Sequence, residues 1–147
     1  MAELDPLREG KQQRKFTKAM RLRKGHQFQA VFQRRVSVSD KSMVVYGLWN
    51  DVGHGRVGLS ISKRVTRTAP ARNRWKRILR EAYRLDHETY PPGLDLVILA
   101  RSPMPGPLAL VRQSLGRLLV KLARRLGPMP GGPAPDQAGP DHQGVGG

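Results

Sequence analysis

The chain has 147 residues, a length that argues for one domain with short appendages. Lys and Arg total 27 against 11 Asp and Glu, a formal net charge of +16, and an excess of this size is usually tolerated because a polyanion neutralises it. The absence of cysteine excludes disulfides, thiolate metal sites and cysteine nucleophiles. No stretch approaches the ~20 apolar residues of a membrane span, and the N-terminal sequence lacks the apolar core of a secretory signal. We therefore expect a cytoplasmic protein that binds nucleic acid or, as the alternative, an anionic membrane surface.

Both ends of the chain differ in composition from its middle. Residues 127–147 contain 7 Gly, 5 Pro and no Lys or Arg, and such a segment cannot bury enough apolar surface to fold, which predicts a disordered tail. Residues 1–19 are polar and basic with almost no apolar periodicity, so we expect a flexible N-terminal extension. The folded domain is therefore predicted over residues 20–126.

The first half of this domain is predicted to form one helix and two strands. Phe28, Val31 and Phe32 recur at the i, i+3, i+4 spacing of a short helix. Residues 43–49 (MVVYGLW) are apolar, β-branched and aromatic, and residues 56–62 (RVGLSIS) alternate apolar with small side chains, so both segments predict strands. The Gly-containing turn between the two segments predicts that they pair as an antiparallel hairpin.

The second half is predicted to contain two helices and one strand. A helix is expected over about residues 71–85, directly after Pro70. Residues 94–100 (LDLVILA) form a short apolar run, which favours a buried strand over a helix. A long amphipathic helix follows, and its apolar stripe consists of Leu108, Val111, Leu115, Leu118, Leu119, Leu122 and Leu126. The resulting order α-β-β-α-β-α predicts an α/β sandwich, with helices packed on a single sheet.

The helix predicted over residues 71–85 (ARNRWKRILREAYRL) has one apolar and one basic face. At ~100° per residue, one arc collects Trp75, Ile78, Leu79, Ala82 and Leu85. The opposite arc collects Arg72, Lys76, Arg77, Arg80 and Arg84, with Asn73 among them and Arg74 at the boundary. Cations at one-turn spacing suit the repeated charges of a phosphate backbone. The upstream Lys63, Arg64 and Arg67 extend this surface to the helix N-terminus, where the dipole also favours anions.

A solvated basic face is the alternative interpretation of this pattern. Glu81 is the only acidic residue between Asp51 and Asp86, so little neutralises the charge internally, and this imbalance favours a binding face. The charge pattern alone does not distinguish RNA, DNA and lipid as the binding partner.

A second candidate surface combines aromatic with small polar residues: Phe28, Phe32, Tyr46, Ser60 and Ser62. Core packing is the simplest account of the aromatic side chains. The alternative is a groove between the first helix and the sheet, in which unpaired bases stack on the rings at ~1–3 kcal/mol per base. Gly58 and the two serines would leave room for a nucleic-acid strand on the sheet.

Signatures of a catalytic site built from protein side chains are weak. The 4 His are not spaced like pairs of metal ligands, and the polar end of a helix explains Asp86, His87 and Glu88. The sequence contains no H-E-x-x-H, P-loop or G-x-S-x-G motif. A protein-based hydrolase is therefore not expected.

Three segments together carry a resemblance to a known family. Residues 56–64 (RVGLSISKR) are followed by ARNRWKRILREAYR, with Arg72, Asn73 and Arg74 at its start. LRKGHQFQAVF precedes them and LDLVILAR follows. In this order, over about residues 20–126, the segments resemble the protein subunit of bacterial ribonuclease P, whose hallmark is an Arg-Asn-Arg helix after a V-G-[LIF]-S-[VI]-[ST]-[KR] strand. One extra residue before Arg72 and a Trp at position 75 depart from the family pattern.

The resemblance implies an α+β sandwich of order α-β-β-β-α-β-α, related to a ribosomal-protein domain. Its four-stranded sheet includes a left-handed β-α-β crossover, and the strand not predicted above would lie around residues 36–39 or within 41–50. The resemblance also implies a cytoplasmic ribonucleoprotein endonuclease that removes the 5′ leader from precursor tRNA. The catalytic part of that enzyme is its RNA subunit, which uses Mg²⁺. The protein broadens the substrate range, lowers the Mg²⁺ demand and supplies no catalytic residue.

Two sets of site residues follow from the resemblance. The residues implied to contact the catalytic RNA are Arg64, Arg67, Arg72, Asn73, Arg74, Lys76, Arg77 and Arg80. The residues implied to form a cleft for the single-stranded leader are Phe28, Phe32, Val44, Tyr46, Ser60, Ser62 and Lys63. Neither DNA nor a membrane is an expected partner. A ribosomal or ribosome-assembly RNA-binding protein without a role in cleavage is the alternative.

Overall fold

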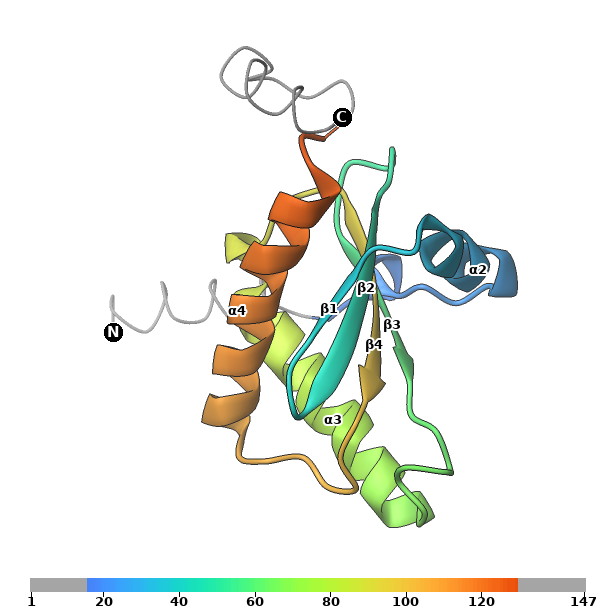
Figure 1. The fold of residues 1–147 in the computed structure, drawn as a ribbon, viewed down its shortest axis with the longest axis vertical. Coiled ribbons are helices and arrows are strands. Elements are labelled where there is room, and N and C mark those ends of the chain that lie inside the picture. Colours follow the sequence, from blue (N-terminus) through green and yellow to red (C-terminus); the bar gives the residue numbers. More distant parts are fainter. Residues whose placement is uncertain (1–15, 130–147) are drawn as a thin grey trace, which may run out of the picture.

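A four-stranded sheet with helices on both faces forms the body of the computed structural model, which describes residues 16–129 (Figure 1). The elements are η1 (Lys18–Met20), α2 (Gly25–Arg34), β1 (Ser37–Ser39), β2 (Met43–Trp49), β3 (Arg56–Ser60), α3 (Ala69–Asp86), η2 (His87–Thr89), β4 (Leu94–Ala100) and α4 (Leu108–Leu126). The order of α-helices and strands confirms the α-β-β-β-α-β-α expectation, and the additional strand is β1.

The strand order in the sheet is β1-β2-β4-β3. β4 pairs antiparallel with β2 and parallel with β3, and α3 connects the two parallel strands. The hairpin predicted between residues 43–49 and 56–62 is therefore wrong, because β4 lies between β2 and β3. Six of the seven residues of β4 are buried. A central position between two strands satisfies such a continuous apolar run, since both of its faces are then covered.

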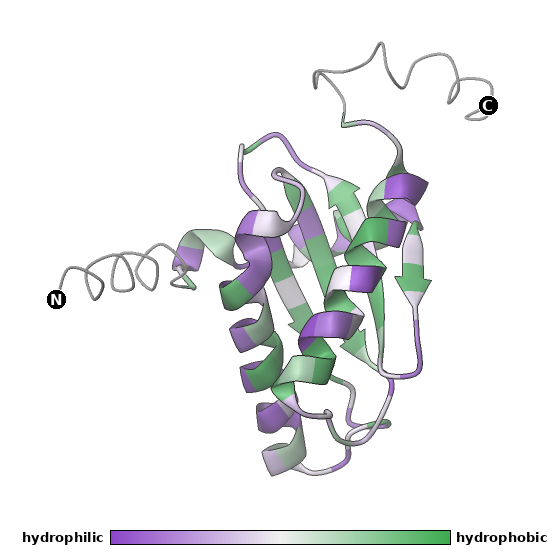
Figure 2. Cartoon of the chain, turned by 90° about the vertical axis from the view of Figure 1, so that its left-hand side faces the viewer, coloured by the Kyte–Doolittle hydropathy of each residue, from purple (hydrophilic) through white to green (hydrophobic). Residues whose placement is uncertain are grey.

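The larger core lies between the sheet and the pair α3 and α4. Trp75 and Leu79 from α3 and Leu115 and Leu122 from α4 are fully buried there, and both helices lie in front of this face of the sheet in Figure 2. α3 begins where Thr68 caps it, with the Ala71 N–H donating to Thr68 Oγ1 at 3.3 Å. None of the helices within residues 16–129 combines the length and apolar character needed to cross a membrane.

A smaller core lies on the opposite face of the sheet, under α2. Leu22, Val31 and Val97 are buried in it, and Phe28, Phe32, Tyr46, Leu48 and Leu99 pack around them. α2 lies on the side of the sheet away from α4 (Figure 1). The two faces therefore differ, because one is covered by two long helices and the other by one short helix.

Parts of both predicted appendages pack on the domain. The Phe16 ring lies edge-on to Tyr83 with centroids 6.0 Å apart, and residues 18–20 form η1. At the other end, Trp49 Nε1–H donates to the carbonyl of Gly127 at 3.1 Å. Residues 16–19 and 127 are thus part of the packed domain, whereas the predictions for residues 1–15 and 130–147 lie outside the described residues.

Candidate nucleic-acid interface

The basic face of α3 is positioned by the burial of its other face. Trp75, Leu79, Ala82 and Tyr83 are buried against the sheet and α4, so the cations on the remaining arc point outward. Arg74 and Arg77 are exposed, and Lys76 and Arg80 are half-buried. The two-faced helix predicted from the sequence is confirmed, although its exposed arc is not uniform.

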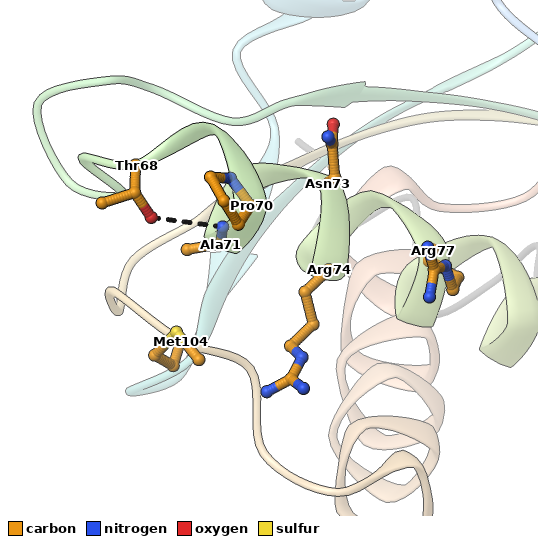
Figure 3. Close-up of a pocket in the computed structure, with 7 residues that line it drawn as sticks. All are labelled: Thr68, Pro70, Ala71, Asn73, Arg74, Arg77 and Met104. Carbon is orange, nitrogen blue, oxygen red and sulfur yellow. Dashed lines mark hydrogen bonds between the residues drawn. The ribbon is translucent and has the colours of Figure 1, made fainter.

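The first turns of α3 border an open depression of about 600 Å³. Its lining consists of Thr68, Pro70, Ala71, Asn73, Arg74, Arg77 and Met104 (Figure 3). The side chains of Asn73 and Arg74 project to different sides of the helix, and Arg74 extends on the side of the loop that carries Met104 (Figure 3). The helix can therefore contact a ligand along two flanks.

Arg72 differs from its neighbours because its guanidinium already has partners in the protein. Its Nη1 donates to the carbonyl of Thr66 at 3.0 Å and to that of Arg67 at 3.1 Å. Thr66 is fully buried, and its Oγ1 donates to the Ser102 carbonyl at 3.3 Å. Trp75 Nε1–H donates to the same carbonyl at 2.9 Å. Arg72 thus holds the backbone of the loop before α3 at Thr66 and Arg67, in addition to any contact with RNA.

Most of the positive charge on α3 is not neutralised by ion pairs among the described residues. Within residues 16–129, such pairs involve Arg56, Arg84, Arg112 and Arg117. On α3, Arg84 pairs with Glu81 at 2.6 Å, and this hydrogen bond raises the pKa of Arg84 and lowers the pKa of Glu81. None of the seven cations predicted to contact the catalytic RNA is in those pairs, so no described carboxylate neutralises their charge.

The predicted leader cleft lies on the face of the sheet that α2 partly covers. The rings of Phe32 and Tyr46 meet edge to face with centroids 5.0 Å apart. Phe28 lies over Gly58, where a Cβ would be 2.5 Å from Phe28 Cζ. These aromatic side chains are half-buried, so they pack against the small core and keep part of each ring exposed.

On the same face of the sheet, the row of side chains next to these rings is partly exposed to solvent. Its register aligns Ser39 with Val44, Val44 with Leu99, and Leu99 with Ser60. Val44 and Leu99 are half-buried, and the two serines at the ends are exposed. We call these four residues the open strip. Its apolar centre and small polar ends leave the sheet accessible beside α2.

Ser62 and Lys63 lie in the turn after β3 rather than on the sheet. The predicted strand over residues 56–62 ends two residues early, at Ser60. Ser62 Oγ accepts a hydrogen bond from the Arg64 N–H at 2.9 Å, and Lys63 is exposed. These two residues therefore continue from the end of the open strip toward the basic loop before α3.

Phe16 and Arg21 are not among the site residues predicted from the sequence. The Arg21 guanidinium lies over the Phe16 ring, with Cζ 5.2 Å from the centroid, in the range of a cation–π contact. Both residues border the flank of α3 that carries Lys76 and Arg80. The only signal in the sequence was the basic run RLRK at residues 21–24, which gave no indication that it lies beside α3.

The acidic residues do not form a metal site within residues 16–129, where no three His, Cys, Asp or Glu side chains are grouped to hold an ion. Asp95, for example, accepts two hydrogen bonds from Arg56 at 2.9 and 2.8 Å. Asp86 does the same with Arg112 at 2.9 and 2.7 Å. These two carboxylates are therefore occupied by arginines; the resemblance implies Mg²⁺ on the RNA subunit, and no step is assigned to a metal on this chain.

Comparison with known proteins gives a consistent result. A family model for ribonuclease P matches residues 16–123. A "Ribonuclease P protein component" from Exiguobacterium sp. is 48% identical over 86 residues, or 58% of this chain and 74% of that protein. Proteins of the same name from Pelotomaculum thermopropionicum and Brevibacillus brevis are 38% and 41% identical. Their alignments each cover 71% of this chain, and 89% and 81% of the respective relatives.

Solved structures of RNase P proteins are also similar to this chain. The RNase P protein of Staphylococcus aureus is 30% identical with a TM-score of 0.61, over 75% of this chain and 100% of that one. The RNase P protein of Thermotoga maritima is 27% identical with a TM-score of 0.63, over 70% and 97%. The family match begins at residue 16, the residue whose ring packs on Tyr83.

Proposed function

Because the chain belongs to the family of bacterial ribonuclease P protein components, we propose that its two candidate surfaces bind two different RNAs. Members of this family are the non-catalytic protein subunits of an endoribonuclease that also contains an RNA subunit. The basic face of α3 binds the RNA subunit, and the open strip with the rings beside it binds the 5′ leader of precursor tRNA. Family membership removes the alternative of a ribosomal protein without a role in cleavage.

The observation that carries this proposal is the chemical difference between two separate surfaces. The face of α3 offers cations that described carboxylates leave unpaired, and phosphates of a folded RNA are bound mainly through such charges. Arg side chains add planar, bidentate contacts to phosphate oxygens. These contacts depend on charge and spacing, so they suit a large structured RNA.

The open strip has little charge and suits an unpaired strand instead. Phe32 and Tyr46 offer partly exposed rings at its side, on which bases stack without regard to sequence. Val44 and Leu99 form an apolar floor with Ser60 at the edge. A surface that binds by stacking tolerates many leader sequences, which one enzyme for all precursor tRNAs requires.

We assign the Mg²⁺ of the reaction to the RNA subunit, as the resemblance to the family implies. The contribution of the protein is electrostatic. Its cations reduce the repulsion between two large polyanions, and the Mg²⁺ concentration needed for productive binding falls accordingly.

The RNA-binding face is tested by reversing one charge. Arg74→Glu should weaken binding of the protein to the RNA subunit alone, because Arg74 is exposed and has no ion pair among the described residues. Arg124→Glu on α4, an equal change in charge at an exposed position, is the matched control. Arg72 is a poorer choice, since its loss also frees the loop at Thr66 and Arg67. Equal weakening by both variants would show that net charge, and not this face, decides binding.

The leader surface is tested with precursor and mature tRNA bound to the reconstituted enzyme. Tyr46→Ala removes a ring beside the open strip and should weaken binding of the precursor while leaving mature tRNA unaffected. Val120→Ala, at a side chain 55% exposed on α4, is the control. If Tyr46→Ala and Arg74→Glu weakened both tRNAs equally, the division into two surfaces would be wrong. Cleavage at low Mg²⁺ that requires both protein and RNA completes the test.

A further inference from the structure

The segment before α2 runs along the free edge of the sheet and brings a cation to the flank of α3. β3 is an edge strand, and the Leu22 N–H donates to the Val57 carbonyl at 3.0 Å. Arg21 and Val57 form an isolated parallel bridge. Because side chains alternate along an extended segment, Leu22 enters the small core under α2 and Arg21 points to the other side, toward α3.

A hollow of about 190 Å³ lies between this segment, β3 and α3. It is lined by Phe16, Arg21, Leu22, Arg23, Phe28, Val57, Gly58, Leu59, Lys76 and Arg80. Four of these residues are cations, and none is acidic. A second hollow of about 450 Å³ shares Phe16, Arg21, Lys76 and Arg80 and continues along α3 to Asn73, Arg77, Glu81 and Arg84. Its one carboxylate, Glu81, is bonded to Arg84.

Two of the arginines that line the first hollow, Arg21 and Arg80, are close enough to disfavour each other's charge. Burial, and after it the charge of Arg21, lowers the pKa of Arg80. Arg21 is held in place over the Phe16 ring, and Phe16 is in turn packed edge-on against Tyr83. The fold therefore holds cations together without a described carboxylate between them, an arrangement that an anion would stabilise.

We propose that Arg21, Lys76 and Arg80 form a phosphate-binding site that holds a phosphodiester of the RNA subunit. Two guanidinium groups offer paired donors that match phosphate oxygens, and an ammonium adds a third positive contact. The larger hollow continues along α3 toward Asn73 and Arg77, whereas the smaller one also borders Phe28 and Gly58 at the edge of the other sheet face. This inference rests on the proposed function, and it adds the segment before α2 to the RNA interface.

The test compares three single-charge variants in direct binding to the RNA subunit, without tRNA, over a series of salt concentrations. Arg21→Gln and Lys76→Gln should each lower affinity about tenfold at low salt and reduce the slope of log affinity against log salt by about one. Arg124→Gln, the same loss of charge on α4, should leave the slope unchanged. Lys76→Gln keeps the test valid if Arg21→Gln disturbs the packing of Phe16, and thermal unfolding of each free variant reports that disturbance.

The possible results separate the inference from the proposed function. If the unaltered protein bound the RNA subunit without salt dependence, the proposed function itself would fail. If it bound with a steep slope and both test variants matched Arg124→Gln, this phosphate site alone would be refuted. A loss seen only with precursor tRNA present would assign the site to the leader and overturn its assignment to the RNA subunit. A reduced slope with the RNA subunit alone would support it.

Discussion

Gly58 offers a way to move the Phe28 ring without removing it. An alanine Cβ at position 58 would lie 2.5 Å from Phe28 Cζ, 2.8 Å from Cε2 and 3.1 Å from Leu22 Cβ. The first two distances cannot be accommodated without movement, whereas Leu22 needs to shift by only a few tenths of an ångström. Phe28 is half-buried, so its ring can turn outward toward solvent. We therefore expect Gly58→Ala to displace the ring from its place beside the open strip.

The cost in stability should be small, because two effects oppose each other. Replacing a strand glycine by alanine gains about 0.5–1 kcal/mol from the lower entropy of the unfolded chain, and moving the ring offsets this gain. Gly47→Ala is the contrasting variant, since its Cβ would lie 2.5 Å from Leu122 Cδ2 and 3.0 Å from Cγ. Leu122 is fully buried in the larger core and cannot turn outward, so this variant should lose about 1–3 kcal/mol.

In leader binding we expect the larger loss from Gly58→Ala and the smaller one from Gly47→Ala, the reverse of their effects on stability. If one base stacks on Phe28, Gly58→Ala loses about 1–3 kcal/mol of leader binding, which is about 5- to 150-fold in the ratio of precursor to mature tRNA affinity. Gly47→Ala strains only the face covered by α3 and α4 and should leave that ratio unchanged in the folded protein. The assay pairs urea unfolding of each variant with tRNA binding by the reconstituted enzyme. An unchanged ratio for Gly58→Ala, or an equal change for Gly47→Ala, would refute the placement of the leader beside Phe28.

Other predictions concern the cores and the acid side of the pH profile. Trp75→Phe should destabilise the protein by about 0.5–1.5 kcal/mol in urea unfolding, because the Ser102 carbonyl loses one of its two donors and keeps Thr66 Oγ1. Arg56→Gln should cost about 3–5 kcal/mol by the same measurement, since Asp95 is 3% exposed and loses its paired cation. Burial raises the pKa of Asp40, but its hydrogen bonds lower the pKa by more, to below the ordinary value. The stability that this carboxylate contributes is therefore present above its unfolded pKa and lost as the pH falls through the folded one, so Asp40→Asn should flatten the loss of stability below about pH 4.

The sequence determines most of the elements but not which strands pair. The alternation in RVGLSIS and the apolar run MVVYGLW predicted β3 and β2, and their closeness in the chain suggested a hairpin. Pairing is decided by burial of the whole sheet, which local alternation does not report. The run LDLVILA contained the relevant signal, since a strand that is apolar at nearly every position needs cover on both faces and belongs at the centre.

For the candidate sites, too, the sequence predicted one part and could not predict another. Charge and helical periodicity predicted the outward face of α3, and the structure places Arg74 and Arg77 there. The same pattern cannot distinguish Arg72, which binds two carbonyls of the preceding loop, from Arg74, which is exposed. That difference depends on where the chain enters the helix, and the path of the loop is set by the buried Thr66 and its bond to Ser102.

The position of Arg21 beside α3 is a part of the proposed interface that no local sequence pattern predicts. β3 is an edge strand, and an uncovered edge exposes backbone groups that pair readily with another chain. The segment that covers this edge binds Val57 with the amide of Leu22, and the alternation of an extended chain then fixes Arg21 on the side of α3. Protection of the sheet edge and assembly of the cation cluster therefore have one structural cause. A charge count of α3 alone underestimates the RNA surface, because a residue more than fifty positions away from Lys76 in the sequence completes it.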